Sequence, residues 1–228
     1  MAQAKIEITN DGPYLVSGGL PLSQEQMVTV GDHREMRPGR TFEVEDSYAL
    51  CRCGHSKNMP FCDGSHLSAD FEGAETASHQ PFAERAEHFE GPTLSLEDDE
   101  RCAFARFCHR AGSEVWSLTE RAQDAETREE AMKAAYECPA GRLQHHDKEN
   151  GDKLVEPELS PRIDLLEDPE KSCSGPIYVQ GGVELVGADG EAYEQRNRYA
   201  LCRCGHSDNK PFCDAMHVSV GYSDQLDQ

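Results

Sequence analysis

The chain has no long hydrophobic run: none of its apolar stretches approaches the ~20 residues that a membrane-spanning helix requires. The first residues, Met-Ala-Gln-Ala-Lys, contain no hydrophobic signal region, so we expect neither a membrane anchor nor a secretion signal. Basic residues are also scarce, because 22 Lys and Arg stand against 43 Asp and Glu for a net charge of −21. This balance argues against binding to nucleic acid or to anionic membranes, whereas basic patches on a partner protein would be attracted.

The sequence also lacks the common signatures of catalysis. No nucleophile–base pair, no pair of catalytic carboxylates and no Gly-rich phosphate loop stands out. We therefore expect a protein that is not an enzyme. Tryptophan occurs once, at Trp116, where we expect it to pack in a small core.

Cysteine, in contrast, is abundant: there are ten, and nine of them fall into ligand-like patterns, which suits a reducing compartment and predicts a cytoplasmic protein. Two stretches nearly repeat each other with the spacing C-x-C-x8-C-x3-H. Such a cluster of thiols and imidazole predicts a metal site in each stretch. The predicted ligands are Cys51, Cys53, Cys62 and His66 in the first stretch and Cys202, Cys204, Cys213 and His217 in the second.

The first stretch resembles the CDGSH iron–sulfur family, whose pattern C-x-C-x2-(S/T)-x3-P-x-C-D-G-(S/A/T)-H it satisfies at every position. The second stretch keeps the four ligands but departs from the pattern at Ala215, where the family has Gly, and at Met216, where it has a small residue. Because alanine is disfavoured where Gly is used for a positive φ, we expect a strained turn before His217. The resemblance implies a 2Fe–2S cluster held by three cysteines and one histidine in each stretch.

The ligand spacing is compatible with two iron atoms that take two ligands each. Cys51 and Cys53 are expected to share one iron, which leaves Cys62 and His66 for the other. The latter are an i, i+4 pair that faces one way if a helix begins near Asp63. Two other interpretations stay open. One is a zinc site with the same four ligands; the other is a disulfide framework, which would leave one of three cysteines per stretch unpaired.

The repeat extends beyond the ligands. Gly12–Gly19 matches Gly175–Gly182, and Tyr48–Leu50 matches Tyr199–Leu201 directly before the first cysteine of each stretch. Each unit is therefore predicted to contain a Gly-Pro turn, a short strand, a hairpin and a strand that leads into the ligand loop. A unit of this size cannot bury a core alone. CDGSH proteins pair two such units about a two-fold axis, so the resemblance implies an intrachain pseudo-dimer here.

A third group of cysteines lies between the two units. Cys102 and Cys108 have the spacing C-x5-C, and Cys138 follows with Pro139 directly behind it. Bacterial ferredoxins use C-x2-C-x2-C followed by a distant Cys-Pro. The segment resembles a divergent, ferredoxin-like single-cluster domain of the kind that accompanies CDGSH units in some bacterial proteins. That resemblance implies one further cluster held by Cys102, Cys108 and Cys138.

The second ligand position of the ferredoxin pattern is occupied by Ala105, whose methyl group cannot bind iron. We therefore expect a 3Fe–4S cluster, or a 4Fe–4S cluster whose fourth ligand is His109, Cys173 or water. The competing interpretation is a small helical spacer with buried free cysteines.

The sequence predicts an α+β segment around these cysteines. Residues 92–96 and 115–118 are expected to be strands, and the capping box at 127–130 is expected to begin a helix that ends at Cys138. Residues 144–172 are polar, acidic and rich in proline, and are expected to be a linker in which the two adjacent histidines face solvent. The predicted division is a first CDGSH unit at 1–75, a ferredoxin-like segment at 76–143, an acidic linker at 144–172 and a second CDGSH unit at 173–228.

The sequence thus predicts an α+β protein in which two small β-rich CDGSH units pair around a ferredoxin-like segment. The predicted function is one-electron transfer by two 2Fe–2S clusters and one 3Fe–4S or 4Fe–4S cluster. We expect a cytoplasmic monomer whose partner is a redox protein or reductase. Two alternatives stay open: an iron–sulfur cluster donor or redox sensor, and a structural zinc protein.

Overall fold

The computed structural model describes residues 4–226, which form mostly β-structure with a few short helices. The first unit contains β1 (Lys5–Ile8), β2 (Tyr14–Ser17), β3 (Leu22–Val30), β4 (His33–Phe42), β5 (Ser47–Leu50) and the 3-10 turn η1 (Ser65–Leu67). The central elements are α1 (Phe82–Arg85), β6 (Glu87–Glu90), β7 (Leu94–Asp98), β8 (His109–Arg110), β9 (Ser113–Glu114), α2 (Val115–Glu120), α3 (Ala125–Tyr136), β10 (Leu143–Asp147), η2 (Lys148–Asn150) and β11 (Lys153–Val155). The last elements are β12 (Arg162–Asp168), β13 (Cys173–Gln180), β14 (Glu184–Val186), β15 (Arg198–Leu201) and α4 (Met216–Ser219). Within residues 4–226, no helix combines the length and apolar character needed to cross a bilayer.

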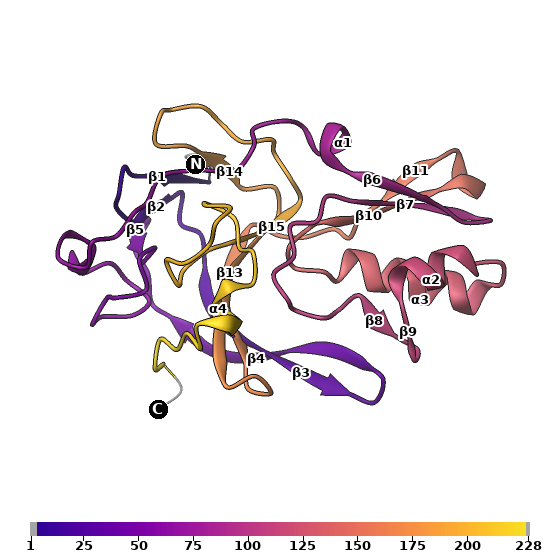
Figure 1. The fold of residues 1–228 in the computed structure, drawn as a ribbon, viewed down its shortest axis with the longest axis horizontal. Coiled ribbons are helices and arrows are strands. Elements are labelled where there is room, and N and C mark those ends of the chain that lie inside the picture. Colours follow the sequence, from indigo (N-terminus) through magenta and orange to yellow (C-terminus); the bar gives the residue numbers. More distant parts are fainter. Residues whose placement is uncertain (1–3, 227–228) are drawn as a thin grey trace.

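The strands form three sheets and one short hairpin. The first sheet has the order β14-β1-β2-β5, the second β15-β13-β12-β3-β4 and the third β11-β10-β7-β6, while β8 pairs with β9 alone. Figure 1 shows the first two sheets at one end of the molecule, with the third sheet and helices α2 and α3 at the other.

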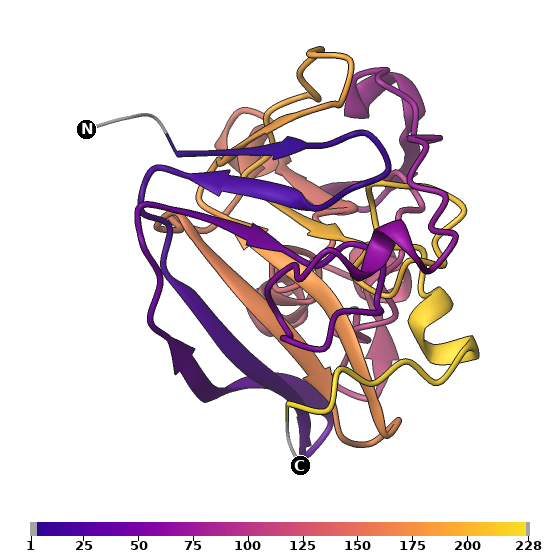
Figure 2. The ribbon, with the colours of Figure 1, turned by 90° about the vertical axis from the view of Figure 1, so that its left-hand side faces the viewer.

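The first two sheets exchange strands. Strand β14 comes from the C-terminal part of the chain but pairs in parallel with β1, with Ile6 opposite Leu185. In the other direction, β3 comes from the N-terminal part and pairs in parallel with β12, with Leu22 opposite Ile163. Each sheet is therefore completed by a strand from the other half of the sequence. Figure 2 shows the indigo strands of the first sheet in front of the orange strands of the second.

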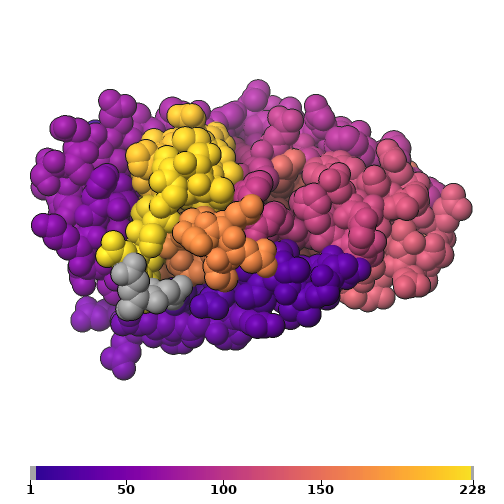
Figure 3. Space-filling view, turned by 60° about the horizontal axis from the view of Figure 1, so that its bottom comes forward, coloured from indigo at the N-terminus to yellow at the C-terminus, as the bar shows by residue number. Residues whose placement is uncertain are grey.

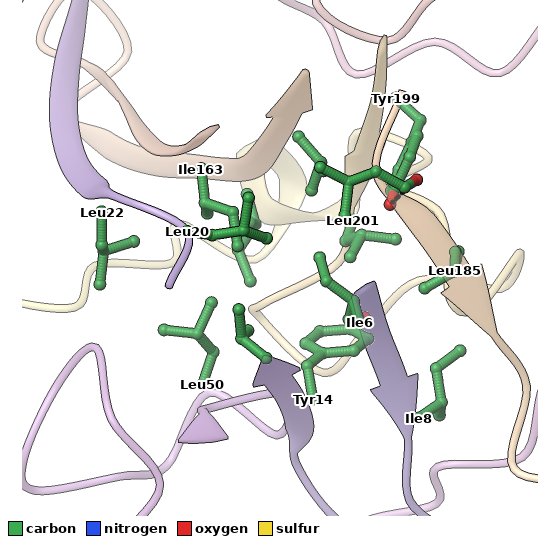
Figure 4. Close-up of a cluster of buried hydrophobic side chains, with 14 of the residues drawn as sticks. Ile6, Ile8, Tyr14, Leu20, Leu22, Leu50, Ile163, Leu185, Tyr199 and Leu201 are labelled. Atoms are coloured by element: carbon green, nitrogen blue, oxygen red, sulfur yellow. Dashed lines mark hydrogen bonds between the residues drawn. The ribbon is translucent and has the colours of Figure 1, made fainter. Parts of the chain in front are cut away.

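A hydrophobic core lies between these two sheets and draws on both halves of the chain (Figure 4). Alternate residues of each strand point inward, as expected for strands with one covered face. In β1 these are Ile6 and Ile8, and in β2 they are Tyr14 and Val16. Burying a side chain of this kind contributes roughly 1.5–3 kcal/mol. Members of the core from the C-terminal half include Ile163, Ile177, Leu185, Tyr199, Leu201 and Phe212.

The central segment has a core of its own. Helices α2 and α3 pack on the sheet formed by β6, β7, β10 and β11, and bury a set of small and aliphatic side chains. Helix α3 presents Ala131, Ala134 and Ala135 to this core, which is the 3.6-residue spacing of one helix face. Trp116 packs at the edge of the same core, as its predicted role requires.

One predicted element of the central segment is wrong, and another is present but begins earlier than predicted. Residues 115–118 are not a strand but the start of helix α2, because Val115, Leu118 and Thr119 are buried together at helical spacing. The helix expected to begin at the capping box starts earlier, since the Asp124 carboxylate accepts the N–H of Thr127 at 2.9 Å and caps α3. The strand expected at 92–96 is present as β7.

The prediction of a linker over residues 144–172 is wrong as well. This stretch contains most of β10 together with β11 and β12, and β12 is the middle strand of the second sheet. Its apolar residues Ile163, Leu165 and Leu166 are fully buried. The acidic and proline-rich composition of this stretch gave no indication of strand β12. The fold nevertheless requires it, because β3 pairs with β12. The other domain boundaries stay predictions.

His145 contradicts the expectation that both histidines of this stretch face solvent. Its side chain is fully buried between β10 and α2, and its Nε2 lies 2.7 Å from the hydroxyl of Thr119. That hydroxyl donates to the Val115 carbonyl, so it accepts the Nε2 proton. Burial, together with the charge of Arg128, lowers the pKa of His145 to about 3. His145 is therefore neutral in the folded protein.

A folded pKa below the ordinary value of 6.5 makes stability fall as the pH falls through the interval from about 6.5 to about 3. In that interval the unfolded chain binds a proton that the folded chain does not bind. The free energy of unfolding therefore falls by up to ~1.4 kcal/mol for each pH unit. We expect His145→Gln, which keeps the donor but does not titrate, to flatten this dependence between pH 6.5 and 5. Urea unfolding at several pH values measures it. His146→Gln, at the neighbouring position of β10, is the control and should keep the wild-type slope; equal slopes in wild type and His145→Gln would contradict the assignment.

Candidate metal centres

The first ligand loop folds back on the strand that leads into it. The N–H of Cys51 donates to the Pro60 carbonyl at 2.8 Å, and the N–H of Cys62 donates to the Ala49 carbonyl at 2.9 Å. Across the loop, the hydroxyl of Ser56 donates to the Phe61 carbonyl at 2.6 Å. These bonds place all three cysteines beside the end of β5.

The ligands of this loop meet in two pairs. The Sγ atoms of Cys51 and Cys53 lie 3.7 Å apart, and the Sγ of Cys62 lies 3.5 Å from the Nδ1 of His66. These are the two pairs that the sequence predicted. The helix expected near Asp63 is only the 3-10 turn η1; the Asp63 carboxylate instead ties the loop together by accepting the N–H groups of Lys57 and Ser65.

The second loop repeats this geometry. The N–H of Cys202 donates to Pro211 and that of Cys213 to Ala200, at 2.8 and 2.9 Å. Cys202 and Cys204 have their Sγ atoms 3.7 Å apart, while the Sγ of Cys213 lies 3.4 Å from the Nδ1 of His217. Asp214 accepts the N–H groups of Asp208 and Met216, as Asp63 does in the first loop.

The chemistry of each loop fits a two-metal cluster. The contact between the paired sulfurs lowers the pKa of Cys51 to about 6 and that of Cys202 to about 7, which favours one thiolate in each pair. The N–H of His55 points at the Sγ of Cys53 at 3.4 Å. Across residues 4–226, no three His, Cys, Asp or Glu side chains converge as the ligands of one ion would. In each loop the predicted ligands therefore form two separate close pairs.

The central cysteines gather beside α3. Cys138 follows directly on the C-terminus of that helix, and the Cys102 loop is folded with Phe104 and Arg106 at positive φ, so that the Phe104 N–H points at the Cys102 Sγ at 3.4 Å. Burial, together with the charges of Cys138 and Cys102, raises the pKa of Cys108 to about 12. The three predicted ligands are therefore neighbours, and they share a mostly apolar environment.

Ala105 does not lie with these cysteines, contrary to the ferredoxin pattern. It packs in a separate buried cluster with Met27, Phe107, Leu166 and Tyr178. Ala103 is the alanine that packs in the same core as Cys138. The expectation that Ala105 occupies a ligand position is therefore wrong.

The two protein groups considered as a fourth ligand are placed elsewhere. The imidazole of His109 is half exposed and lies 3.7 Å from the Glu114 carboxylate. Cys173 begins strand β13 opposite Asp168, and burial, together with the charges of Asp168 and Glu167, raises the pKa of its thiol. Neither of these two side chains is among the groups whose charges affect the pKa of Cys108, as Cys102 and Cys138 are.

The central site lies against the second loop. Cys138 and Cys213 belong to one buried cluster, together with Ala140 and Ala200. Arg198, at the start of β15, donates to the carbonyls of Cys138, Ala135 and Leu143 at 2.9 to 3.1 Å. Figure 3 shows the yellow C-terminal segment beside the magenta central segment. The repeat places Ser47 where Arg198 stands, so this docking has no counterpart in the first unit.

The two ligand loops meet back to back at Gly54 and Gly205. A Cβ at Gly54 would lie 2.6 Å from the Cys204 carbonyl oxygen, and one at Gly205 would lie 2.4 Å from that of Cys53. Both glycines also have positive φ. The hydroxyl of Tyr14, from the first unit, donates to the Cys202 carbonyl at 2.8 Å. Sequence reasoning missed these contacts, although the glycine that follows each C-x-C was a visible signal.

Comparison with protein families finds two models on this chain. The iron-binding zinc finger of CDGSH type matches residues 11–67 and 174–218, and the divergent 4Fe-4S mono-cluster matches residues 89–148. No curated protein and no solved structure gives a significant match. The chain carries two CDGSH iron-binding segments on either side of a divergent 4Fe–4S segment, as the sequence predicted.

The turn before each histidine generates a paired prediction. Gly64 has φ 86° and Ala215 has φ 73°, so both occupy the left-handed region that the sequence pattern predicted. No atom lies within 4 Å of a Cβ placed at Gly64, so an added methyl group there costs backbone strain alone. After allowance for the greater flexibility of unfolded glycine, we expect Ala215→Gly to stabilise the protein by ~0.5–1 kcal/mol and Gly64→Ala to destabilise it by a similar amount.

Denaturant midpoints of the two variants, compared with wild type, measure this effect. Opposite signs are expected from the matched pair. A loss of stability in Ala215→Gly would show that the methyl group of Ala215 contributes more through packing than it costs through its backbone conformation.

Proposed function

We propose that this chain, with its two CDGSH segments around a divergent 4Fe–4S segment, is a multi-cluster iron–sulfur protein that carries single electrons and is not an enzyme. Each CDGSH loop would hold a 2Fe–2S cluster on three cysteines and one histidine, and the central cysteines would hold a 3Fe–4S or 4Fe–4S cluster. When bound, these clusters supply reversible one-electron chemistry. The observation that carries the proposal is the separation of the ligands of both loops into two close pairs.

The paired arrangement favours iron–sulfur over structural zinc. A structural zinc site gathers four ligands around one ion. In both loops the atoms of the thiol pair and of the thiol–imidazole pair lie 3.4 to 3.7 Å apart, which fits two metals that take two ligands each. The N–H groups of His55 and Phe104 are aimed at sulfur, and such donors tune the potential of a bound cluster.

The two CDGSH segments would act as an intrachain pseudo-dimer. The reciprocal parallel pairing of β14 with β1 and of β3 with β12 supports this proposal, because each sheet receives the equivalent strand of the other half. The mutual contact of Gly54 and Gly205 with the opposite loop supports it as well. A protein that pairs internally in this way would be a monomer.

The order of the three sites supports electron transfer within one molecule. The central cysteines pack beside Cys213, and the second loop packs back to back with the first. The second CDGSH site therefore lies between the other two. Arg198 fixes this arrangement by binding three carbonyls next to Cys138. We propose a redox protein or reductase as the partner, drawn to the net charge of −21 by a basic patch, and a cytoplasmic location.

One observation favours cluster donation or redox sensing as a second candidate function. Cys62 and His66 are partly exposed, so a cluster in the first loop is accessible to an acceptor or oxidant. Transfer of cluster to an apo acceptor, compared with the rate of reduction by a ferredoxin reductase, separates this function from electron transfer.

The proposed cofactors predict about seven or eight irons per chain, with matching sulfide and visible absorbance. Elemental analysis, sulfide assay and EPR of anaerobically purified protein measure this. A colourless protein that contains zinc would contradict the proposal. About four irons would remove the central cluster and leave the CDGSH pair.

The imidazole ligands should raise the potential of their clusters relative to a fourth thiolate. We expect His66→Cys and His217→Cys each to lower the midpoint potential of one cluster, by on the order of 100 mV, and to leave the other near its wild-type value. Redox titration followed by EPR measures both clusters in each variant. If neither variant changes a potential, these histidines are not ligands.

A further inference from the structure

Each CDGSH loop buries an arginine between its first two cysteines. Arg52 follows Cys51 and Arg203 follows Cys202, and both side chains are almost fully buried. Their Nε atoms make the same bond, to the Gly12 and Gly175 carbonyls at 2.7 Å. Each loop therefore holds a guanidinium charge next to two predicted ligands, in a region where water screens charge poorly.

The two arginines differ in what neutralises them. Arg203 pairs with the carboxylates of Glu167 and Asp224, both of which are buried. Arg52 donates only to backbone carbonyls, at Gly12, Gly73 and Thr9, and forms no ion pair within residues 4–226. The positive charge beside the first site is thus unpaired, whereas the charge beside the second site is offset by two nearby acids.

Gly73 explains why the first arginine has no acid beside it. The repeat aligns Gly73 with Asp224, since both stand two residues after the aromatic residue that packs on the arginine, Phe71 in one unit and Tyr222 in the other. A Cβ at Gly73 would lie 2.3 Å from a terminal nitrogen of Arg52. The guanidinium fills the space that a side chain would need, so this position cannot carry a carboxylate.

The nearby acid of the first unit offsets this charge less well. Asp11 accepts the Gly73 N–H at 2.8 Å, but its side chain is exposed and is therefore screened by water.

The exposure of the ligands also differs between the two sites, and it too favours reduction of the first site. His217 and Cys213 are 2% and 4% exposed, whereas His66 and Cys62 are partly exposed. One-electron reduction adds one negative charge to a site, and both a nearby positive charge and contact with water stabilise that charge. The unpaired Arg52 and the greater exposure both favour reduction of the first site.

We infer that the two CDGSH sites are electrostatically inequivalent, and that Arg52 gives the first site the higher reduction potential while Glu167 and Asp224 hold the second site lower. This inference rests on the proposed function. The second site lies between the central cysteines and the first loop. With the higher potential at the first site, an electron that enters at the central site comes to rest at the first site.

The test is an anaerobic titration of the full-length, cluster-loaded protein with dithionite as the one-electron reductant, followed by EPR. Wild type should show two 2Fe–2S couples whose reduction equilibrium constants differ at least tenfold, which is about 59 mV for a one-electron couple. Asp224→Asn keeps an acceptor oxygen for the Ser174 hydroxyl. It should raise only the reduction potential of the lower-potential site, by at least threefold in the reduction equilibrium constant of that site. Glu167→Gln should act in the same direction.

Arg52→Gln should lower only the reduction potential of the higher-potential site. Arg52→Lys should leave that potential near the wild-type value, because it keeps the positive charge; the comparison distinguishes the effect of the charge from the effect of packing. Asp11→Asn is the matched control beside the first site and should shift neither couple by more than a factor of two. Because Asp224→Asn is nearly isosteric, it tests the inference even if the Arg52 variants do not fold.

Loaded clusters with one shared potential, or a shift of the upper couple in Asp224→Asn, would overturn this inference and leave the proposed function intact. A large shift of the upper couple in Asp11→Asn would also overturn it, because Asp11 would then neutralise Arg52. A protein that binds no cluster would contradict the proposed function, and this inference with it.

Discussion

The parallel pairing of exchanged strands is the constraint on which the rest of the structure depends. Neither cysteine-rich unit has enough apolar residues to bury a core alone, and the core between the two sheets takes Ile6 and Tyr14 from one unit and Leu185 and Leu201 from the other. Because β14 completes the first sheet and β3 completes the second, the two units cannot separate without breaking both sheets. The ligand loops at the ends of β5 and β15 are therefore held in a fixed relation to each other.

That fixed relation lets the loops meet through their backbones. Positions 54 and 205 require glycine for two reasons. The backbone has a positive φ at both, and a carbonyl oxygen of the opposite loop lies too close for a Cβ at either position. The hydroxyl of Tyr14 adds a bond across the interface to the Cys202 carbonyl, and the position equivalent to Tyr14 is Ile177, which cannot return it. The interface is thus symmetric in its backbone contacts and asymmetric in its side chains.

The sequence was most informative where function requires particular residues at a fixed spacing. The ligand pairs and the positive φ before each histidine followed from the motif alone, since they depend on local geometry. The parts it did not reveal depend on distant contacts. Strand β12 was concealed by its acidic composition, and the burial of His145 depends on Thr119, 26 residues away in the chain. Ala105 was misplaced because a ferredoxin pattern was applied to a loop whose side chains face two different cores.

The docking of the central segment turns a repeated structure into an ordered one. Arg198 binds the end of α3 and the Cys138 loop, and the repeat has Ser47 at the matching position, so this contact is made with one unit and has no equivalent in the other. The unit that receives it has the buried histidine and the neutralised arginine; the unit left free has the accessible histidine and the unpaired charge. An arrangement of two equal sites would give an electron no preferred position. In the proposed function, the few residues that differ between the two repeats would set an order among the three sites, with the central site at one end and the accessible first site at the other.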